Sequence, residues 1–193
     1  MACDNFMWFP TAATGGLLSS AATKPQGETQ DKWFSAKGAL ELLSISFGVA
    51  QAETTGSGSG GASAGKAKFD EFQIEKFVDL ASVPLFNACA AGAHFPSVCL
   101  AVRKAGGDPL LYFQTVFRQV FVTNISWTGG AGEEAPKETI KFKYGAMGVQ
   151  YARQLSTGAA GTPIQAHWSM VTNKPTLDVP GLGGAPTFLP PKL

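Results

Sequence analysis

The chain has 193 residues, a formal net charge of +1 and only 15% charged residues, against roughly 25% in a typical soluble domain. This length suits one compact domain that buries a core without disulfides, and the scattered, balanced charge argues against a nucleic-acid partner. Uncharged groups must therefore cover much of the surface, and contacts with other subunits are one way to cover it.

The ends and the cysteines bear on location. The first residues, MACDNFMWFP, carry an acidic residue where a signal peptide needs positive charge, and no apolar run reaches the ~18 residues of a membrane helix. Cys3, Cys89 and Cys99 form no C-x-x-C pair, and the last two lie in apolar stretches as small buried hydrophobes. We expect a cytoplasmic protein that, if it is exported, leaves without a cleaved signal peptide.

The first half of the chain predicts three strands and one helix. Residues 4–9 form a short strand, followed by an irregular segment at 10–25. Between 39 and 51, apolar side chains occupy the odd positions Leu43, Ile45, Phe47 and Val49, which predicts a strand with one buried face. A further strand over 72–80 places Lys76 on the same face as Phe72 and Ile74. Ser82 then reads as the cap of a helix that Gly92 closes.

The second half predicts strands alone. Residues 95–104 and 110–127 read as an antiparallel hairpin around Gly106-Gly107, and the second strand is apolar on both faces, so both must be covered. A strand over 138–144 changes its apolar parity after Gly145, as an inserted bulge residue would cause. A last strand covers 164–171. The chain is therefore predicted to be mainly β, a closed or nearly closed antiparallel barrel or pair of packed sheets with one helix.

The segment GSGSGGASAGKA, residues 56–67, contains two catalytic patterns by letter. Gly60 to Lys66 fits a phosphate loop, and Ser63 occupies the serine position of a G-x-S-x-G elbow. The phosphate loop lacks its Ser/Thr, because Ala67 stands there, and a strand rather than a helix follows. The serine lies in a run of small residues without a rigid turn. A flexible loop is the favoured interpretation; a small hydrolase or nucleotide-binding enzyme using Ser63 or Lys66 is the alternative from a different class.

Other candidate chemistry is sparse. His94 and His167 have no second histidine at the spacing of a metal site, and Glu133-Glu134 stands in a glycine-rich loop as solvated charge. The lysines at 137, 141 and 143 are expected on a water-facing strand side. We expect no catalytic residue, no metal and no cofactor.

The run FQIEKFVDLASVPLFNACAAGAHFPSVCLAVRKAGG, residues 72–107, closely resembles the haemolysin-coregulated protein (Hcp) family, the tube subunit of the bacterial type VI secretion system. GETQDKW (27–33), LLSISFGVAQ (42–51) and the glycine-rich loop ending at Lys66 also look like family features, and weaker similarity reaches Asn173. Residues 11–25 look inserted, and the segment after 173 looks extended.

The resemblance implies a β-barrel that forms hexameric rings stacked into a hollow tube. It further implies a contractile sheath, a baseplate and a spike protein as partners, expulsion when the sheath contracts, and small effectors carried in the lumen. A tail-tube protein of a phage-like or extracellular contractile particle is the close alternative. The expected domain spans 1–173, with an extended loop at 52–66 and a Pro/Gly-rich tail at 174–193.

The resemblance also implies that the glycine-rich loop meets a neighbouring ring. The expected ring-stacking or subunit-interface residues are Thr54, Thr55, Gly56, Ser57, Gly58, Ser59, Gly60, Gly61, Ala62, Ser63, Ala64, Gly65 and Lys66.

Overall fold

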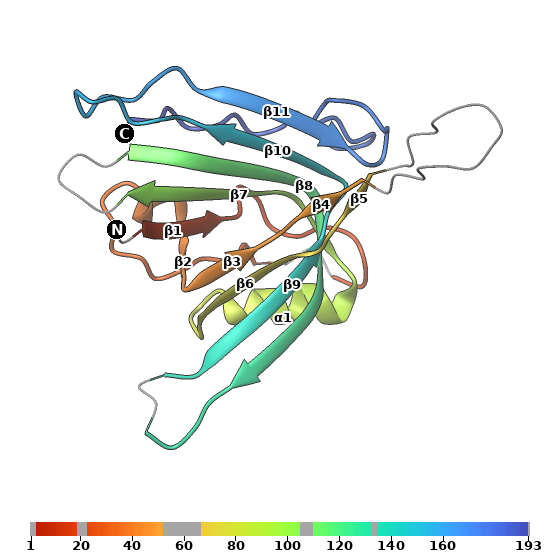
Figure 1. Ribbon diagram of the computed structural model, residues 1–193. Helices are drawn as coiled ribbons and strands as arrows, with labels where there is room; N and C mark the ends of the chain where they lie inside the picture. Colours follow the sequence, from red (N-terminus) through yellow and green to blue (C-terminus); the bar gives the residue numbers. More distant parts are fainter. Residues whose placement is uncertain (1–2, 19–22, 52–66, 105–109, 133–134, 193) are drawn as a thin grey trace, which may run out of the picture.

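The computed structural model describes residues 3–18, 23–51, 67–104, 110–132 and 135–192. They form a strongly curved antiparallel sheet with one α-helix at one end (Figure 1), which confirms the predicted fold class. The strands are β1 (Cys3–Trp8), β2 (Leu40–Leu42), β3 (Ser44–Ser46), β4 (Val49–Ala50), β5 (Lys68–Phe69), β6 (Phe72–Phe77), β7 (His94–Lys104), β8 (Leu110–Thr128), β9 (Lys137–Lys143), β10 (Ala146–Tyr151) and β11 (Ile164–Ser169). The helix α1 spans Ser82–Ala91, and a short 3-10 turn covers Ser35–Lys37.

The sheet curls until its two ends nearly meet. Its order is β2-β1-β7-β8-β9-β6-β3, with β10 and β11 continuing from β8 on a branch, and β4-β5 forming a separate two-stranded ribbon. β2 pairs with β1 and β3 pairs with β6, yet only Leu43 separates β2 from β3. The Leu43 backbone N–H already donates to the Glu75 carbonyl at 2.8 Å. One short stretch of chain therefore joins both ends of the sheet into a nearly closed barrel.

This change of partner corrects the predicted face of the 39–51 strand. Leu40 and Leu42, at even positions, are buried in the core inside the barrel, while Leu43 and Val49 are exposed. Ile45 and Phe47, at odd positions, pack on the core only in part. The prediction assumed one unbroken strand, but the chain passes from β1 to β6 at Leu43, and the inward-facing parity changes with the partner.

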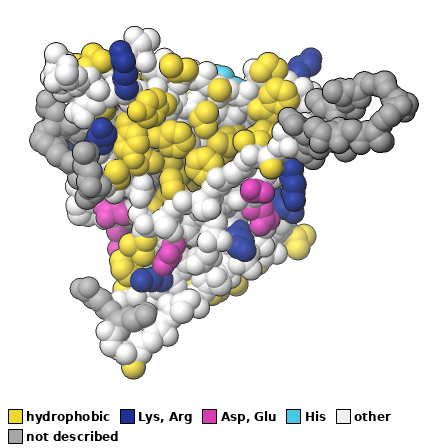
Figure 2. Space-filling model, viewed as in Figure 1, with side chains coloured by type: hydrophobic (Ala, Val, Ile, Leu, Met, Phe, Trp, Pro, Cys, Tyr) yellow, Lys and Arg dark blue, Asp and Glu magenta, His cyan; other side chains and the backbone are white. Residues whose placement is uncertain are grey.

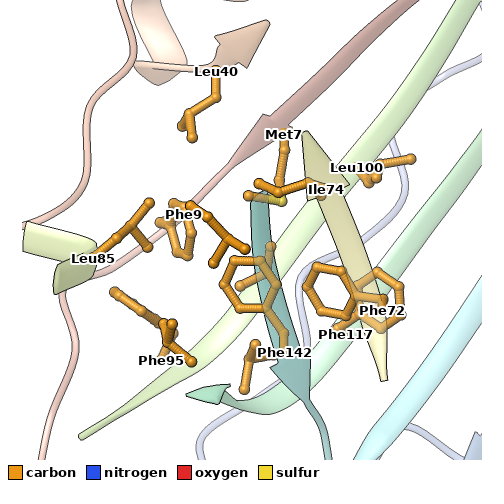
Figure 3. Packing of buried hydrophobic residues seen from close by; sticks show 14 of the residues in the cluster. Met7, Phe9, Leu40, Phe72, Ile74, Leu85, Phe95, Leu100, Phe117 and Phe142 are labelled. Carbon is orange, nitrogen blue, oxygen red and sulfur yellow. The ribbon is translucent and has the colours of Figure 1, made fainter. Parts of the chain in front are cut away.

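The core lies inside the barrel and is rich in phenylalanine. Figure 3 shows Phe72 between Phe117 and Phe142, with Met7, Phe9 and Leu85 closing the space toward the helix. The Phe72 ring stacks on Phe117 at 4.1 Å and on Phe142 at 4.4 Å between centroids. Burial of such large apolar side chains stabilises the folded state by ~25 cal/mol for each Å² removed from water. The apolar interior of the barrel is therefore a main source of stability.

Over residues 110–122, β8 is covered on both faces, as its two-sided apolar pattern predicts, whereas its far end is largely exposed. A second cluster outside the barrel joins Leu111 and Val116 of β8 to Phe6, Trp8 and Phe34. Phe34 stacks on Phe6 at 4.2 Å. Leu177, Phe188 and Leu189 of the C-terminal segment pack on the same cluster. The chain thus covers this second face with its own residues.

The parity change after Gly145 is real, but its predicted cause is wrong. β9 and β10 keep one register along β8, with Lys143 opposite Phe121 and Ala146 opposite Arg118, so no residue is inserted at that point. Instead, Gln119 adopts a positive φ of 51° on β8, directly across from the 144–145 junction. The side chains of β8 and those of the chain running from β9 into β10 therefore change faces of the sheet at the same point.

The helix starts where predicted, but not by the predicted cap. Ser82 is its first residue rather than its N-cap, and the preceding Ala81 makes no side-chain cap. Instead, the Asp79 carboxylate accepts a hydrogen bond from the Ala81 N–H at 2.9 Å, just before the helix begins. Gly92 ends the helix as expected, with φ of 65°, a conformation that glycine adopts at little cost.

Candidate assembly surfaces

The predicted interface residues 54–66 lie outside the described residues, and with them Ser63 and Lys66. The structure does describe the two strands from which that segment departs. β4 and β5 pair as a short antiparallel ribbon, Val49 opposite Phe69 and Ala50 opposite Lys68, and the Asp70 N–H donates to the Gly48 carbonyl at 3.0 Å. Figure 1 shows this ribbon at the rim of the barrel, next to β10 and β11.

The first candidate surface is an apolar groove between this ribbon and the β10–β11 pair. Its volume is about 930 Å³, and we call it the rim groove. Its lining side chains are mainly apolar: Phe47, Val49, Phe69, Met147, Val149 and Trp168. Figure 2 shows hydrophobic side chains gathering over this face of the molecule. Val49 is 61% exposed, so a partner that filled the groove would remove apolar surface from water.

The second candidate surface lies on the helix and the strand ends next to it, and we call it the helix patch. Its exposed members come from the end of β6, the following turn, α1 and the far end of β8: Phe77, Val78, Leu80, Val83, Phe86 and Trp127. Phe86 and Trp127 lie 6.1 Å apart between ring centroids, each half-exposed. Exposed large apolar side chains that contact one another, as Phe86 and Trp127 do, mark an interaction surface. The sequence prediction missed it, because Val78 and Leu80 were placed on the buried face of a longer strand.

A buried ionic cluster lies at the base of the helix patch. The Lys76 ammonium, fully buried, lies 2.5 Å from the Asp79 carboxylate and 2.7 Å from Glu138. Glu138 also accepts hydrogen bonds from the Ser82 hydroxyl at 2.7 Å and the Trp127 indole at 2.9 Å. Burial raises the pKa of Asp79, against the lowering effect of the Lys76 charge. These contacts fasten β6, α1, β8 and β9 to one another.

This cluster has the composition of a catalytic site but not its accessibility. The Lys76 ammonium and the Ser82 hydroxyl lie 3.4 Å apart, yet both are buried, the ammonium is paired with two carboxylates and the hydroxyl donates to Glu138. No substrate atom could reach them. The sequence did contain a signal: a lysine on the apolar face of a predicted strand needs a buried partner.

A second ion pair joins two stretches that carry the family resemblance. Arg103, of RKAGG, contacts Asp31, of GETQDKW, at 2.6 Å and Asp4 at 2.8 Å. Its guanidinium also lies 4.9 Å from the Phe6 ring. Burial alone would raise the pKa of Asp31, but the N–H groups of residues 33 and 34 together with Arg103 outweigh it and hold the pKa below its ordinary value.

The histidines and cysteines play no joint role in the described part of the chain. His94 opens β7 and exchanges backbone hydrogen bonds with Thr14, while His167 lies beside the Phe188 ring at 6.0 Å. Burial raises the pKa of the Cys99 thiol to about 12. The residues that the structure describes contain no group of three or more potential metal ligands. Among those residues no helix is long and apolar enough to span a membrane.

Comparison with known proteins gives one consistent family. The family described as "Type VI secretion system effector, Hcp" matches residues 17–151. Protein hcp1 of Pseudomonas aeruginosa is 30% identical over 110 residues, which cover 56% of this chain and 68% of that protein. A solved type six secretion system protein superimposes with a TM-score of 0.78 at 29% identity, over 91% of this chain and all of the other. Hcp1 from Salmonella typhimurium gives a TM-score of 0.68 at 28% identity, with the same coverage of this chain.

Proposed function

Since the chain belongs to the Hcp family of type VI secretion proteins, a family of structural tube proteins rather than enzymes, we propose that it assembles into hexameric rings that stack as a hollow tube. The observation that carries the proposal is the presence of two unlike apolar surfaces on one body. The rim groove and the helix patch share no strand or helix.

Two unlike surfaces support a head-to-tail contact. A twofold dimer needs one self-complementary patch, whereas a ring needs two different patches that fit each other on successive subunits. We propose that the rim groove of one subunit receives the helix patch of the next. Exposed Val83 and Phe86 on α1 are the side chains best placed to enter an apolar groove, because the helix that presents them contains no charged residue.

Ring stacking is assigned to the loop. We propose that residues 54–66, which lie in the sequence between the paired strands β4 and β5, contact the neighbouring ring. Their small side chains adapt to a partner surface at the entropic cost of becoming ordered. Deleting Thr54 to Gly65 is expected to leave the fold intact and weaken stacking of rings, and an unfolded product would contradict the assignment.

We propose the route of secretion and the partners of this chain from its membership of the Hcp family. Hcp proteins are secreted by the type VI system. We propose a cytoplasmic pool before firing, export without a cleaved signal peptide, and contact with sheath, baseplate and spike. The lumen of the ring would carry small effector proteins. We further propose that residues 1–173 act as the single barrel domain, with 11–25 as an insertion relative to the family.

Light scattering and negative-stain microscopy of purified protein test the assembly. Val83→Asp, at a side chain 66% exposed on the helix patch, is expected to abolish rings, because it places a charge in an apolar interface. Val171→Asp is the matched control, since Val171 is 52% exposed and lies outside both surfaces. Both variants should keep the circular dichroism of the unchanged protein. Rings that persist in Val83→Asp, or a chain that stays monomeric at every concentration, would refute the proposal.

A further inference from the structure

The C-terminal segment after β11 lies across the outer face of the barrel as an extended peptide. Figure 1 shows it running beside β10 and β11, with the C-terminus near the start of β8. It contains no strand or helix among its described residues, 174–192. Nevertheless Val179 is buried, and Leu177, Phe188 and Leu189 pack on the outer cluster of β7 and β8. This segment is bound to the sheet face rather than merely following it.

The face recognises the backbone of this segment. The Gln114 side chain donates to the Leu189 carbonyl at 2.8 Å and accepts the Leu189 N–H at 2.9 Å. Gln150, opposite Gln114 on β10, donates to the same carbonyl at 3.3 Å. Arg118 donates to two successive carbonyls, those of Gly183 and Gly184. Hydrogen bonds to main-chain groups supply affinity for an extended peptide, and here the side chains of the sheet face make them.

Backbone bonds and ring packing complete the recognition. The Leu111 N–H donates to the Pro191 carbonyl at 2.9 Å, and Lys192 forms a β-bridge with Leu110. Phe188 lies 6.0 Å from the His167 ring, nearly parallel to it. The site therefore has polar contacts along about ten residues and an aromatic anchor near its centre.

The polar side chains beneath the segment are buried and form hydrogen bonds with it. Gln114, Gln150 and Arg118 are nearly fully buried. The segment supplies hydrogen-bond partners to Gln114 and Arg118, while Gln150 bonds both the segment and Gln165 of β11. In the described residues Arg118 has no carboxylate within ion-pair distance, and its Nε atom has no hydrogen-bond partner. If the segment detaches, these groups regain water, which lowers the cost of detachment compared with a purely apolar face.

The connection to the barrel permits detachment as a unit. After the bridge between Ser169 and Lys174, the chain contains Pro175, Pro180 and then Gly181, which has a positive φ of 83°. The prolines limit the conformations of a released connector, while the glycine provides a pivot. The contacts made in one chain are chemically identical to those that the same segment would make on another, which makes exchange between copies a low-cost step.

We propose that the outer face formed by Gln114, Arg118 and Gln150 is a docking site for the segment 183–192, and that in the assembled protein it takes this segment from a second copy of the chain. The exchange rests on the proposed function, because stacked rings bring identical segments close together at high local concentration. It would tie subunits together through main-chain contacts, independently of the rim groove and the helix patch.

Peptide binding tests the docking site without any requirement for rings. A fluorescein-labelled peptide of residues 181–192 is titrated against the full chain and against a full-length variant, Phe188→Ala with Leu189→Ala, whose own segment binds weakly. Anisotropy is expected to show at least tenfold tighter binding to the variant. Adding Gln114→Leu and Arg118→Met to it should abolish binding. No binding to any of them, or equal binding to all three, would overturn the proposal.

Photo-crosslinking tests the exchange and does not depend on the stability of those variants. With p-benzoylphenylalanine in place of Phe188, dilute protein should give crosslinks within one chain, and assembled protein should give covalent dimers attached at β10 or β11. Crosslinks confined to single chains in samples where scattering shows rings would refute the exchange. Absence of rings would refute the proposed function instead, while the peptide titration still decides the docking site.

Discussion

Replacing Lys76 by methionine should destabilise the protein more than any comparable surface change. Lys76→Met keeps most of the side-chain volume but leaves Asp79 and Glu138 close together without their shared cation. Glu138 is fully buried, so its charge cannot be relieved by water. Removing one partner of a buried ionic cluster costs about 3–5 kcal/mol. For a chain of this length that corresponds to a fall in Tm of roughly 6–20 °C.

Urea denaturation of unassembled protein measures this effect, with Lys143→Met as the control. Lys143 is 71% exposed at its side chain and lies 3.8 Å from Glu71, so losing that pair should cost less than about 1 kcal/mol. Adding Glu138→Gln to Lys76→Met removes the buried charge and should recover about 1 kcal/mol or more through the coupling of neighbouring sites. Equal unfolding free energies for Lys76→Met and Lys143→Met would show that the cluster does not hold the helix to the barrel.

Three further predictions concern pH, thiols and glycines. The folded pKa of Asp31 lies below the ordinary 3.8, so the Asp31 carboxylate contributes fully to the free energy of unfolding above that value, and this contribution is lost as the pH falls through the folded pKa. Asp31→Asn should therefore make the free energy of unfolding fall less steeply with decreasing pH on the acid side. Cys99, buried and with its pKa raised to about 12, should resist Ellman's reagent at pH 8 until the protein unfolds, whereas exposed Cys3 should react at once; rapid Cys99 labelling of folded protein would contradict its burial. Gly92→Ala meets no atom within 4 Å and should cost about 1 kcal/mol for its positive φ alone. Gly16→Ala should cost more, because its added carbon would lie 2.2 Å from a backbone oxygen, so equal thermal shifts would refute this packing.

The sequence predicts the elements of this fold well because its strands alternate strongly and its helix has clear limits. The hairpin of β7 and β8 and the stop at Gly92 follow from local chemistry that the structure confirms. The parity error lies at Leu43, where the inward face depends on which distant strand lies alongside, and a local pattern holds no information about that strand. At Gly145 the parity change was predicted, but its cause, the positive φ of Gln119, lies on a different strand, β8.

The candidate surfaces were less predictable than the fold. Exposure of Val83, Phe86 and Trp127 depends on how the helix meets the end of β8, which joins residues about 40 positions apart. Both faces of β8 were predicted to be covered, but the strand pattern does not say by what; the chain's own C-terminal segment and Phe34 cover the outer face. Lys76 and Glu138 each share the face of the apolar residues in their strands, a pattern that points to buried partners, and they form an ion pair with each other.

The change of strand partner at Leu43 also affects how the protein folds during synthesis. β1 must wait for β7, with Asp4 opposite Arg103, and β6 must wait for β9, with Phe72 opposite Phe142. The stretch around Leu43 that joins the two ends of the sheet is therefore translated early, but β7 and β9, which pair with β1 and β6, follow late. Pairings between strands distant in sequence form slowly. Until β9 has left the ribosome, the nascent chain presents unpaired strand edges to the solvent, and this interval is when it most needs protection from aggregation.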